Sequence, residues 1–224
     1  MNRRPMALPI AREGYAFIMP TAVAILFFGL MGWLYLAALF FGITCFVIYF
    51  FRNPTRTPPS SEDVIVSPAD GRVLEVATHH EDRFLHREAI KISIFMSLFD
   101  VHVNRSPITG RVTNRVSHPG KFFPANTDKS SLLNEQNAVV LCSNDGFEIL
   151  CIQIAGIIAR RIVCYAQKGN VLKKGQIFGM IRFGSRLELF LPPSVEIRVR
   201  VGDHVKAGET IVGYRNAEKT KDRD

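Results

Sequence analysis

The feature that most constrains this chain is an uncharged, strongly apolar run near its N-terminus. From Tyr15 to Phe51 there are 37 residues without a charge, and 31 of them are apolar. A single helix of that length would measure about 55 Å, whereas the hydrocarbon core of a bilayer is about 30 Å thick. Two helices of about 17 to 18 residues fit better, with a break near Gly29–Gly32. Because those glycines could instead pack within one helix, a single tilted span stays open.

Basic residues flank this run on both sides, which favours a hairpin with both ends in the cytoplasm. They are Arg3, Arg4, Arg12, Arg52 and Arg56. A signal peptide is not expected, because the run is too long and no small-residue cleavage site follows it. We therefore expect residues 1–51 to anchor the chain in the cell membrane. Residues 52–224 should form a β-rich domain on its cytoplasmic side.

The composition of residues 52–224 is that of a soluble, basic domain. They hold 25 of the 28 Lys and Arg residues and 19 of the 20 Asp and Glu residues, a net charge of +6. Such a charge favours an anionic partner, either lipid or nucleic acid. No basic patch is interleaved with aromatic residues, so nucleic acid is not the expected partner. The four Cys lack paired metal-ligand spacing, which predicts reduced, buried thiols.

Short runs of β-branched residues after residue 60 predict a mainly β domain. The runs are 64–66, 71–76, 90–95, 138–141, 147–152 and 195–201, and one short helix is expected over 155–162. Gly169–Gly175 and Gly202–Gly208 form a weak repeat, each leading into a strand-like run. These glycine turns predict a barrel-like β-sandwich with Gly-turn hairpins, preceded by the apolar helical hairpin. Lipoyl and biotinyl carrier domains are similar, but Lys206 lacks their flanking residues.

The pair Gly184–Ser185, near the C-terminal end, has unusual chemical potential. Taken alone, a Gly-Ser pair between apolar strands is usually a turn. A serine hydroxyl can also attack the preceding carbonyl, which is least hindered when that residue is Gly. The resulting ester can eliminate to dehydroalanine, and hydrolysis then leaves a pyruvoyl group. This chemistry needs a base for the hydroxyl and donors for the oxyanion.

Candidate helpers for such chemistry lie upstream in the chain. Pro68-Ala69-Asp70-Gly71 is by itself a turn sequence, and a structural role for His102 stays open. The segment from Asp100 to Arg105 places an acid, an imidazole and a guanidinium within six residues, and the next imidazole is His118. No His has a second His or a Cys three or four residues away, so no metal site is expected.

The ordered set of motifs resembles the short-form phosphatidylserine decarboxylases, from about Arg52 to Tyr214. The motifs are Pro-Ala-Asp-Gly, Asp-Val-His-Val-Asn-Arg-Ser-Pro, His-Pro-Gly-Lys-Phe, Asn-Glu-Gln-Asn and Arg-Phe-Gly-Ser-Arg. The resemblance implies self-cleavage between Gly184 and Ser185 into chains of 184 and 40 residues. Ser185 would become a covalent pyruvoyl cofactor at the head of the small chain.

The resemblance also assigns roles to individual residues. Asp70 would support activation of the serine, with His102 as the base. Longer family members carry Asp-x-His-x-x-His, whose first two positions match Asp100 and His102. The second His position is Arg105 here, and His118 is a candidate to replace it.

The reaction implied is decarboxylation of phosphatidylserine to phosphatidylethanolamine through a Schiff base with the pyruvoyl group. His102 would then return a proton to the product. Arg105 and Lys121 would hold the lipid phosphate, although both residues also fit solvated cations near a membrane. The partners expected are phosphatidylserine in the membrane and the large and small chains of one precursor, and a homo-oligomer stays open. The alternative is a non-enzymatic membrane-anchored β module such as an export adaptor. Adaptors of that kind usually add a long coiled coil, and no heptad region is present.

Overall fold

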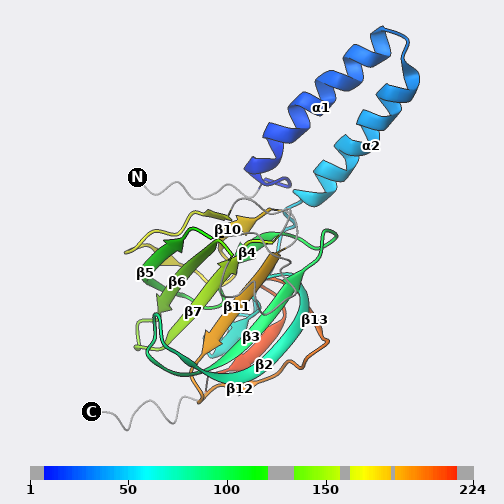
Figure 1. The fold of residues 1–224 in the computed structure, drawn as a ribbon. Helices are drawn as coiled ribbons and strands as arrows, with labels where there is room; N and C mark the ends of the chain where they lie inside the picture. Colours follow the sequence, from blue (N-terminus) through cyan, green and yellow to red (C-terminus); the bar gives the residue numbers. More distant parts are fainter. Residues whose placement is uncertain (1–7, 121–133, 157–161, 183–184, 216–224) are drawn as a thin grey trace. The chain divides into compact units, whose positions relative to one another are not determined.

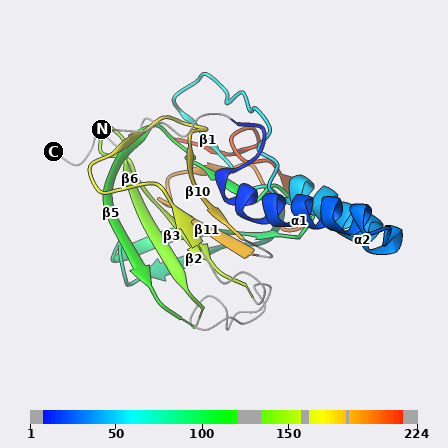
Figure 2. The same ribbon diagram turned by 90° about the horizontal axis from the view of Figure 1, so that it is seen from above.

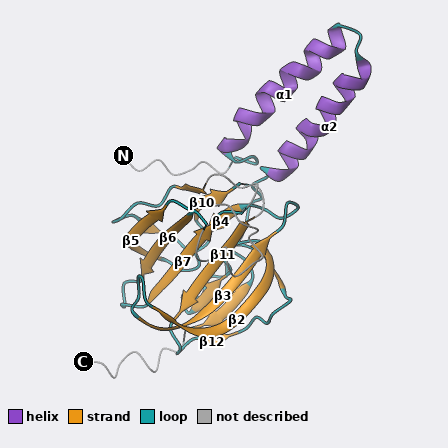
Figure 3. Cartoon of the chain, viewed as in Figure 1, coloured by secondary structure: helices purple, strands orange, loops and turns teal. Residues whose placement is uncertain are grey.

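The computed structural model describes residues 8–120, 134–156, 162–182 and 185–215. The chain forms two compact units, residues 1–55 and residues 56–224. The first contains both helices and the second contains the strands (Figures 1 and 3). The predicted mainly β fold with an N-terminal apolar helix pair is therefore confirmed.

The apolar run folds as two antiparallel helices, α1 (Arg12–Leu30) and α2 (Leu34–Phe50). The break lies at the predicted place, where Gly32 takes a φ of +76° that favours glycine. At the open end of the hairpin, the Ala11 N–H donates to the Phe51 carbonyl at 2.7 Å. A side chain at Gly14 would overlap Phe51, so glycine permits this close approach.

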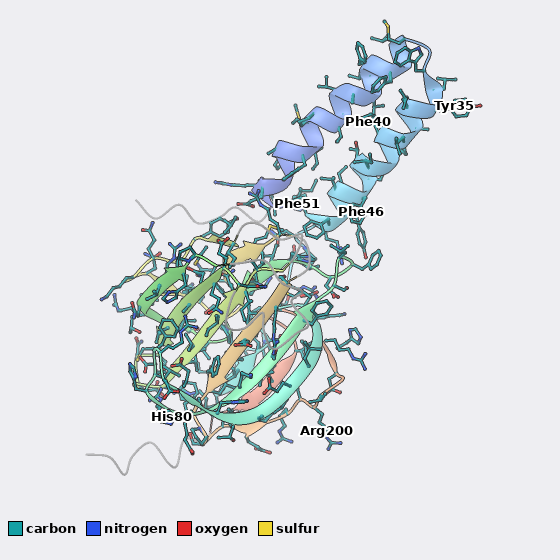
Figure 4. The ribbon with its side chains drawn as sticks, viewed as in Figure 1. Tyr35, Phe40, Phe46, Phe51, His80 and Arg200 are labelled. Atoms are coloured by element: carbon teal, nitrogen blue, oxygen red, sulfur yellow. The ribbon has the colours of Figure 1, made fainter. Side chains whose placement is uncertain are left out.

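The two helices expose apolar side chains around most of their surface. Tyr35 is 94% exposed, and Phe46 also points outward from α2 (Figure 4). By length and composition α1 could cross a membrane, whereas α2, with 17 residues, is slightly short for this. Apolar surface of this extent is typical of segments that contact lipid or another protein.

The second unit is built on one curled, antiparallel sheet of eight strands (Figure 2). Its order is β13-β2-β3-β11-β7-β6-β5-β9. The strands, in that order, are His204–Val205, Gly71–Glu81, Arg87–Met96, Ser185–Leu191, Glu148–Ile154, Gln136–Cys142, Gly110–His118 and Val171–Leu172.

Among the described residues, the unit also contains two three-stranded sheets. One has the order β1-β14-β12 and the other the order β4-β10-β8. The first comprises Val64–Val66, Ile211–Tyr214 and Glu196–Ile197, and the second Val103–Arg105, Ile177–Ile181 and Ile162–Cys164. Both glycine repeats form turns that lead into strands, with positive φ at Gly169, Gly175, Gly202 and Gly208.

The structure differs from the sequence prediction after Ile197. The strand expected over 195–201 is wrong after Ile197, because Asp203 accepts the Arg200 N–H at 2.8 Å and Gly202 turns the chain. The helix expected over 155–162 lies largely outside the described residues, and Ile162 begins β8.

The two faces of the large sheet pack against different clusters. Alternate residues of β11, such as Leu187 and Leu189, pack into the main apolar core. We call the side of the sheet that faces this core the inner face. Phe190 faces a smaller cluster on the opposite, outer face, where Phe84 and Leu85 pack. The carboxylate of Glu81 accepts the N–H groups of Phe84 and Leu85, which holds that β2–β3 turn.

Gly71 provides a test of this packing. Its φ is +150°, and a Cβ there would overlap the carbonyl oxygen of Phe95 on β3. We predict that Gly71→Ala lowers the free energy of unfolding by about 2 to 4 kcal/mol. Gly146→Ala is the control, because Gly146 has a φ of +82° in open space and only the strain of about 1 kcal/mol applies. Thermal unfolding of the two variants in detergent measures the difference, and equal losses would contradict the role of the Phe95 carbonyl.

Candidate active site

Ser185 is the first residue of β11, the strand that pairs with β3 on one side and β7 on the other (Figure 1). Its register partner on β3 is Met96. The residue is fully buried, and its Oγ has no hydrogen-bond partner among the described residues. A buried hydroxyl without a partner costs folding free energy, so such a group calls for a functional explanation. Gly184 lies outside the described residues.

His102 is fully buried immediately before β4. Its Nδ1 lies 3.0 Å from the carbonyl oxygen of Asp100. Because a carbonyl can only accept, Nδ1 carries the proton and Nε2 is the basic nitrogen of the neutral ring. The His102 carbonyl accepts the N–H of Ile181 at 3.3 Å, which places His102 beside the segment that leads to Ser185.

Asp100 shapes the turn between β3 and β4. Its carboxylate accepts the Ser97 N–H at 2.8 Å and the Ser97 hydroxyl at 2.6 Å. The carboxylate therefore fixes the turn, while the main-chain carbonyl of the same residue orients His102.

Asp70 and Arg105 lie together in a cluster of buried charges. The Asp70 carboxylate pairs with Arg56 at 2.8 Å and accepts the Ala207 N–H at 2.8 Å. Arg56 also pairs with Glu209 at 2.7 Å. Burial, together with the charge of Arg56, lowers the pKa of Arg105, whereas Asp70 and Glu209 act in the opposite direction. Sequence reasoning missed Arg56 and Glu209 here, because 153 residues separate them.

The turn that contains Asp70 is tied to the strand that follows His102. The N–H of Arg105 donates to the Pro68 carbonyl at 2.9 Å, and its guanidinium donates to the Gly175 carbonyl at 3.0 Å. The fold thus joins the two motifs that were singled out from the sequence.

The two remaining candidates are placed differently. His118 ends β5, is exposed, and lies on the outer face with its ring centroid 6.1 Å from that of Phe84. Ser185 faces the inner side of the same sheet, as Leu187 does, so His118 is not brought to it. Lys121 lies outside the described residues.

Arg186 is a further buried charge that sequence reasoning missed. It lies on the outer face directly after Ser185, and its Nε donates to Ser93 and lies 3.3 Å from the Glu188 carboxylate. Another guanidinium nitrogen lies 3.6 Å from Glu75. These contacts hold the start of β11 against β2 and β3.

Comparison with known proteins decides the family. The family model for phosphatidylserine decarboxylase matches residues 43–213. The chain belongs to the phosphatidylserine decarboxylase family. The phosphatidylserine decarboxylase proenzyme of Geotalea uraniireducens is 48% identical over 205 residues, 92% of this chain and 96% of the relative. The proenzymes of Syntrophus aciditrophicus and Nitrosomonas europaea are 49% and 46% identical, over 91% of this chain and 96% and 94% of the relatives.

The structure of this family member predicts that Arg56 is essential for the buried charge cluster. Arg56→Met would remove the ion-pair partner that lies 2.8 Å from the Asp70 carboxylate, whose side chain is only 11% exposed. We expect the free energy of unfolding to fall by about 3 kcal/mol. Arg198→Met is the control, because Arg198 and Glu196 are about half exposed and their pair contributes less than about 1 kcal/mol. Denaturant titration of both variants tests this, and similar small losses would contradict it.

Proposed function

We propose that this chain is a self-processing, pyruvoyl-dependent enzyme that decarboxylates phosphatidylserine to phosphatidylethanolamine. The observation that carries the proposal is the buried Ser185 hydroxyl, which has no hydrogen-bond partner among the described residues at the start of a central strand. The relatives of this chain are named phosphatidylserine decarboxylase proenzymes, which supports processing of a precursor. Processing at Ser185 would use this unpartnered hydroxyl and convert the residue into the pyruvoyl group.

The self-cleavage begins with transfer of the Ser185 hydroxyl proton to Nε2 of His102. The oxygen attacks the Gly184 carbonyl carbon, the C–N bond breaks, and the Ser185 nitrogen takes up a proton. Removal of the Ser185 Cα proton then breaks the Cβ–O bond, which releases the Gly184 carboxylate and leaves dehydroalanine. Addition of water and loss of ammonia complete the pyruvoyl group. The Asp100 carbonyl holds the His102 ring in the tautomer that this first step needs.

The pyruvoyl group would supply a carbonyl that withdraws electrons from the bond to the substrate carboxyl group. His102 would hold the proton that the product needs at the carbon that loses CO2. The same Nε2 that accepts a proton during cleavage serves as donor here. Asp70 and Asp100 act as positioning residues. Asp70 does so through its contacts with Arg56 and the Ala207 N–H, and Asp100 through the Ser97 turn.

The lipid substrate explains the apolar hairpin and the basic charge. We propose that α1 and α2 enter the membrane, with the flanking arginines and residues 56–224 on the cytoplasmic side. Arg105 and Lys121 would hold the lipid phosphate. Arg105 is 8% exposed, and its guanidinium donates to the Gly175 carbonyl.

Processing predicts two chains in the purified protein, of 184 and 40 residues, with the small chain blocked at its N-terminus. Ser185→Ala removes the attacking oxygen, so this variant should remain whole and release no CO2 from phosphatidylserine vesicles. Intact-mass analysis and a CO2-release assay measure both results. An unbroken chain in active wild-type preparations would exclude the mechanism.

The role of His102 is tested against His118. We expect His102→Gln to slow processing by about 100-fold or more, because the basic nitrogen is lost. His118→Gln should process within about twofold of wild type, since the exposed ring of His118 lies on the outer face. Time courses of intact mass after cell-free synthesis give both rates. Slow processing in the His118 variant would restore the role expected from the sequence, and fast processing in the His102 variant would remove His102 as the base.

A further inference from the structure

Three buried carboxamides form a continuous hydrogen-bonded row across the inner face. Nδ2 of Asn137 on β6 donates to Oε1 of Gln153 on β7 at 2.8 Å. Nε2 of Gln153 then donates to Oδ1 of Asn104 on β4 at 2.8 Å. Their exposed fractions are 2%, 0% and 0%. Fully buried amides cost folding free energy unless their hydrogen bonds are made, so the bonds within the row restrict how each amide can be oriented.

The direction of every bond in the row is fixed by a charge at one end. Arg115 Nε donates to Oδ1 of Asn137 at 3.1 Å, and the Ser117 hydroxyl donates to the same oxygen at 3.0 Å. A guanidinium cannot accept, so Asn137 must turn its oxygen toward Arg115 and its NH2 toward Gln153. Gln153 is then forced to present its NH2 to Asn104. The far end of the row is therefore the NH2 group of Asn104.

The NH2 group of Asn104 points to Met96, the residue that pairs with Ser185 across the sheet. Its described acceptor is the sulfur of Met96, at 3.7 Å, and a thioether is a weak acceptor. Met96 is the register partner of Ser185, so the two side chains leave the same face of adjacent strands. Met96 thus connects two poorly satisfied polar groups: it accepts from the Asn104 NH2, and it is the cross-strand neighbour of Ser185, whose hydroxyl has no partner among the described residues.

The neighbouring strand leaves room for this arrangement. Gly179 on β10 is the register partner of Asn104. A Cβ at Gly179 would lie 2.8 Å from Nε2 of Gln153. Any larger residue at this position would push the Gln153 amide away from Asn104.

We propose that Asn104 donates a hydrogen bond to the carbonyl oxygen that becomes negatively charged when Ser185 attacks. Gln153, Asn137 and Arg115 are positioning residues that fix which end of the Asn104 amide faces Ser185. This inference rests on the proposed self-cleavage and adds the oxyanion donor that the reaction needs. A preoriented donor in a dry site contributes about 100- to 1,000-fold to such a step.

Asn104→Asp and Asn104→Ala test the donor directly. Both keep the side chain small, and the Asp variant retains an acceptor for Gln153 while it replaces the NH2 group by oxygen. We expect processing of the full chain to slow by about 100-fold in each. Ser117→Ala is the matched control, because Arg115 still sets the direction of the row, and its rate should stay within about twofold of wild type. A folded Asn104→Ala protein that processes within about threefold of wild type overturns the proposal.

Gln153→Glu tests the direction of the row separately from its packing. When protonated, the new carboxyl can accept from Asn137 and donate to Asn104, as Gln153 does. When ionised, it can only accept, so the Asn104 amide reverses and its oxygen faces Ser185. Burial raises the pKa of such a carboxyl. We expect the processing rate relative to wild type to fall at least about tenfold between about pH 5.5 and about pH 8.5.

Each rate is divided by that of wild type at the same pH, because both proteins contain the same base, His102, near Asn104. Arg115 donates to Asn137 at the other end of the row, and burial raises the pKa of the Cys151 and Cys164 thiols. If the substitution only damaged the structure, the processing rate of Gln153→Glu relative to wild type would not change with pH. That result overturns the direction that we assign to the hydrogen bonds of the row. Should the Asn104 variants fail to fold, which their thermal unfolding would show, this ratio decides the proposal.

The outcome separates this inference from the proposed function. Wild-type protein that stays whole while it releases CO2 would overturn the self-cleavage itself. Wild-type protein that processes normally, together with Asn104 variants that process equally fast, would overturn the role of Asn104 alone.

Discussion

The pairing of β11 between β3 and β7 is the constraint on which the rest of this structure depends. The strand hydrogen-bonds on both sides over nearly its whole length, and all seven of its residues are buried. Leu187, Leu189 and Leu191 enter the core on one face, and Arg186 and Glu188 form ion pairs on the other. A break before Ser185 would leave all of these contacts in place. The fold can therefore lose one covalent link there and keep its sheet.

The two faces of this strand explain how reactive chemistry coexists with a stable core. Apolar residues on the inner face exclude water, which strengthens any hydrogen bond made there. The charged residues of β11 lie on the outer face, where Arg186 is paired with Glu188 and Glu75. Polar groups reach the inner face as the amide row, whose members are bonded to one another. The Ser185 hydroxyl differs from these amides, because it has no hydrogen-bond partner among the described residues. It belongs to the residue that directly follows the peptide bond proposed to break.

Much of this architecture follows from sequence pattern alone. The uncharged run and its glycines predict the α1–α2 hairpin, and alternation of β-branched residues predicts β2 and β3. The pattern fails after Ile197, because a single contact from Asp203 redirects the backbone. Such a contact depends on a turn three residues away and leaves no mark in the hydrophobic period.

The site was less accessible to sequence reasoning, because its polar partners come from distant segments. Arg56 and Glu209 resemble ordinary surface charges until the fold brings them to Asp70. The amides of Asn137 and Gln153 did carry a signal, since each interrupts an apolar strand, but nothing in the sequence pairs them with Asn104. His118 is the opposite case. It is close to the other motifs in the sequence, but the alternation of side chains along β5 places it on the outer face, away from Ser185.

A common principle orients the two side chains that act on Ser185 in the proposed reaction. The imidazole of His102 and the amide of Asn104 each have two ends of nearly equal shape, so packing alone cannot choose between them. Each is set by a partner that has a single hydrogen-bonding role. The Asp100 carbonyl only accepts, which leaves Nε2 of His102 for the proposed role of base. The Arg115 guanidinium only donates, which directs the NH2 of Asn104 toward Met96, the cross-strand neighbour of Ser185. Both groups are thus oriented before the first bond breaks, so the precursor needs no reorganisation of these dipoles as charge develops.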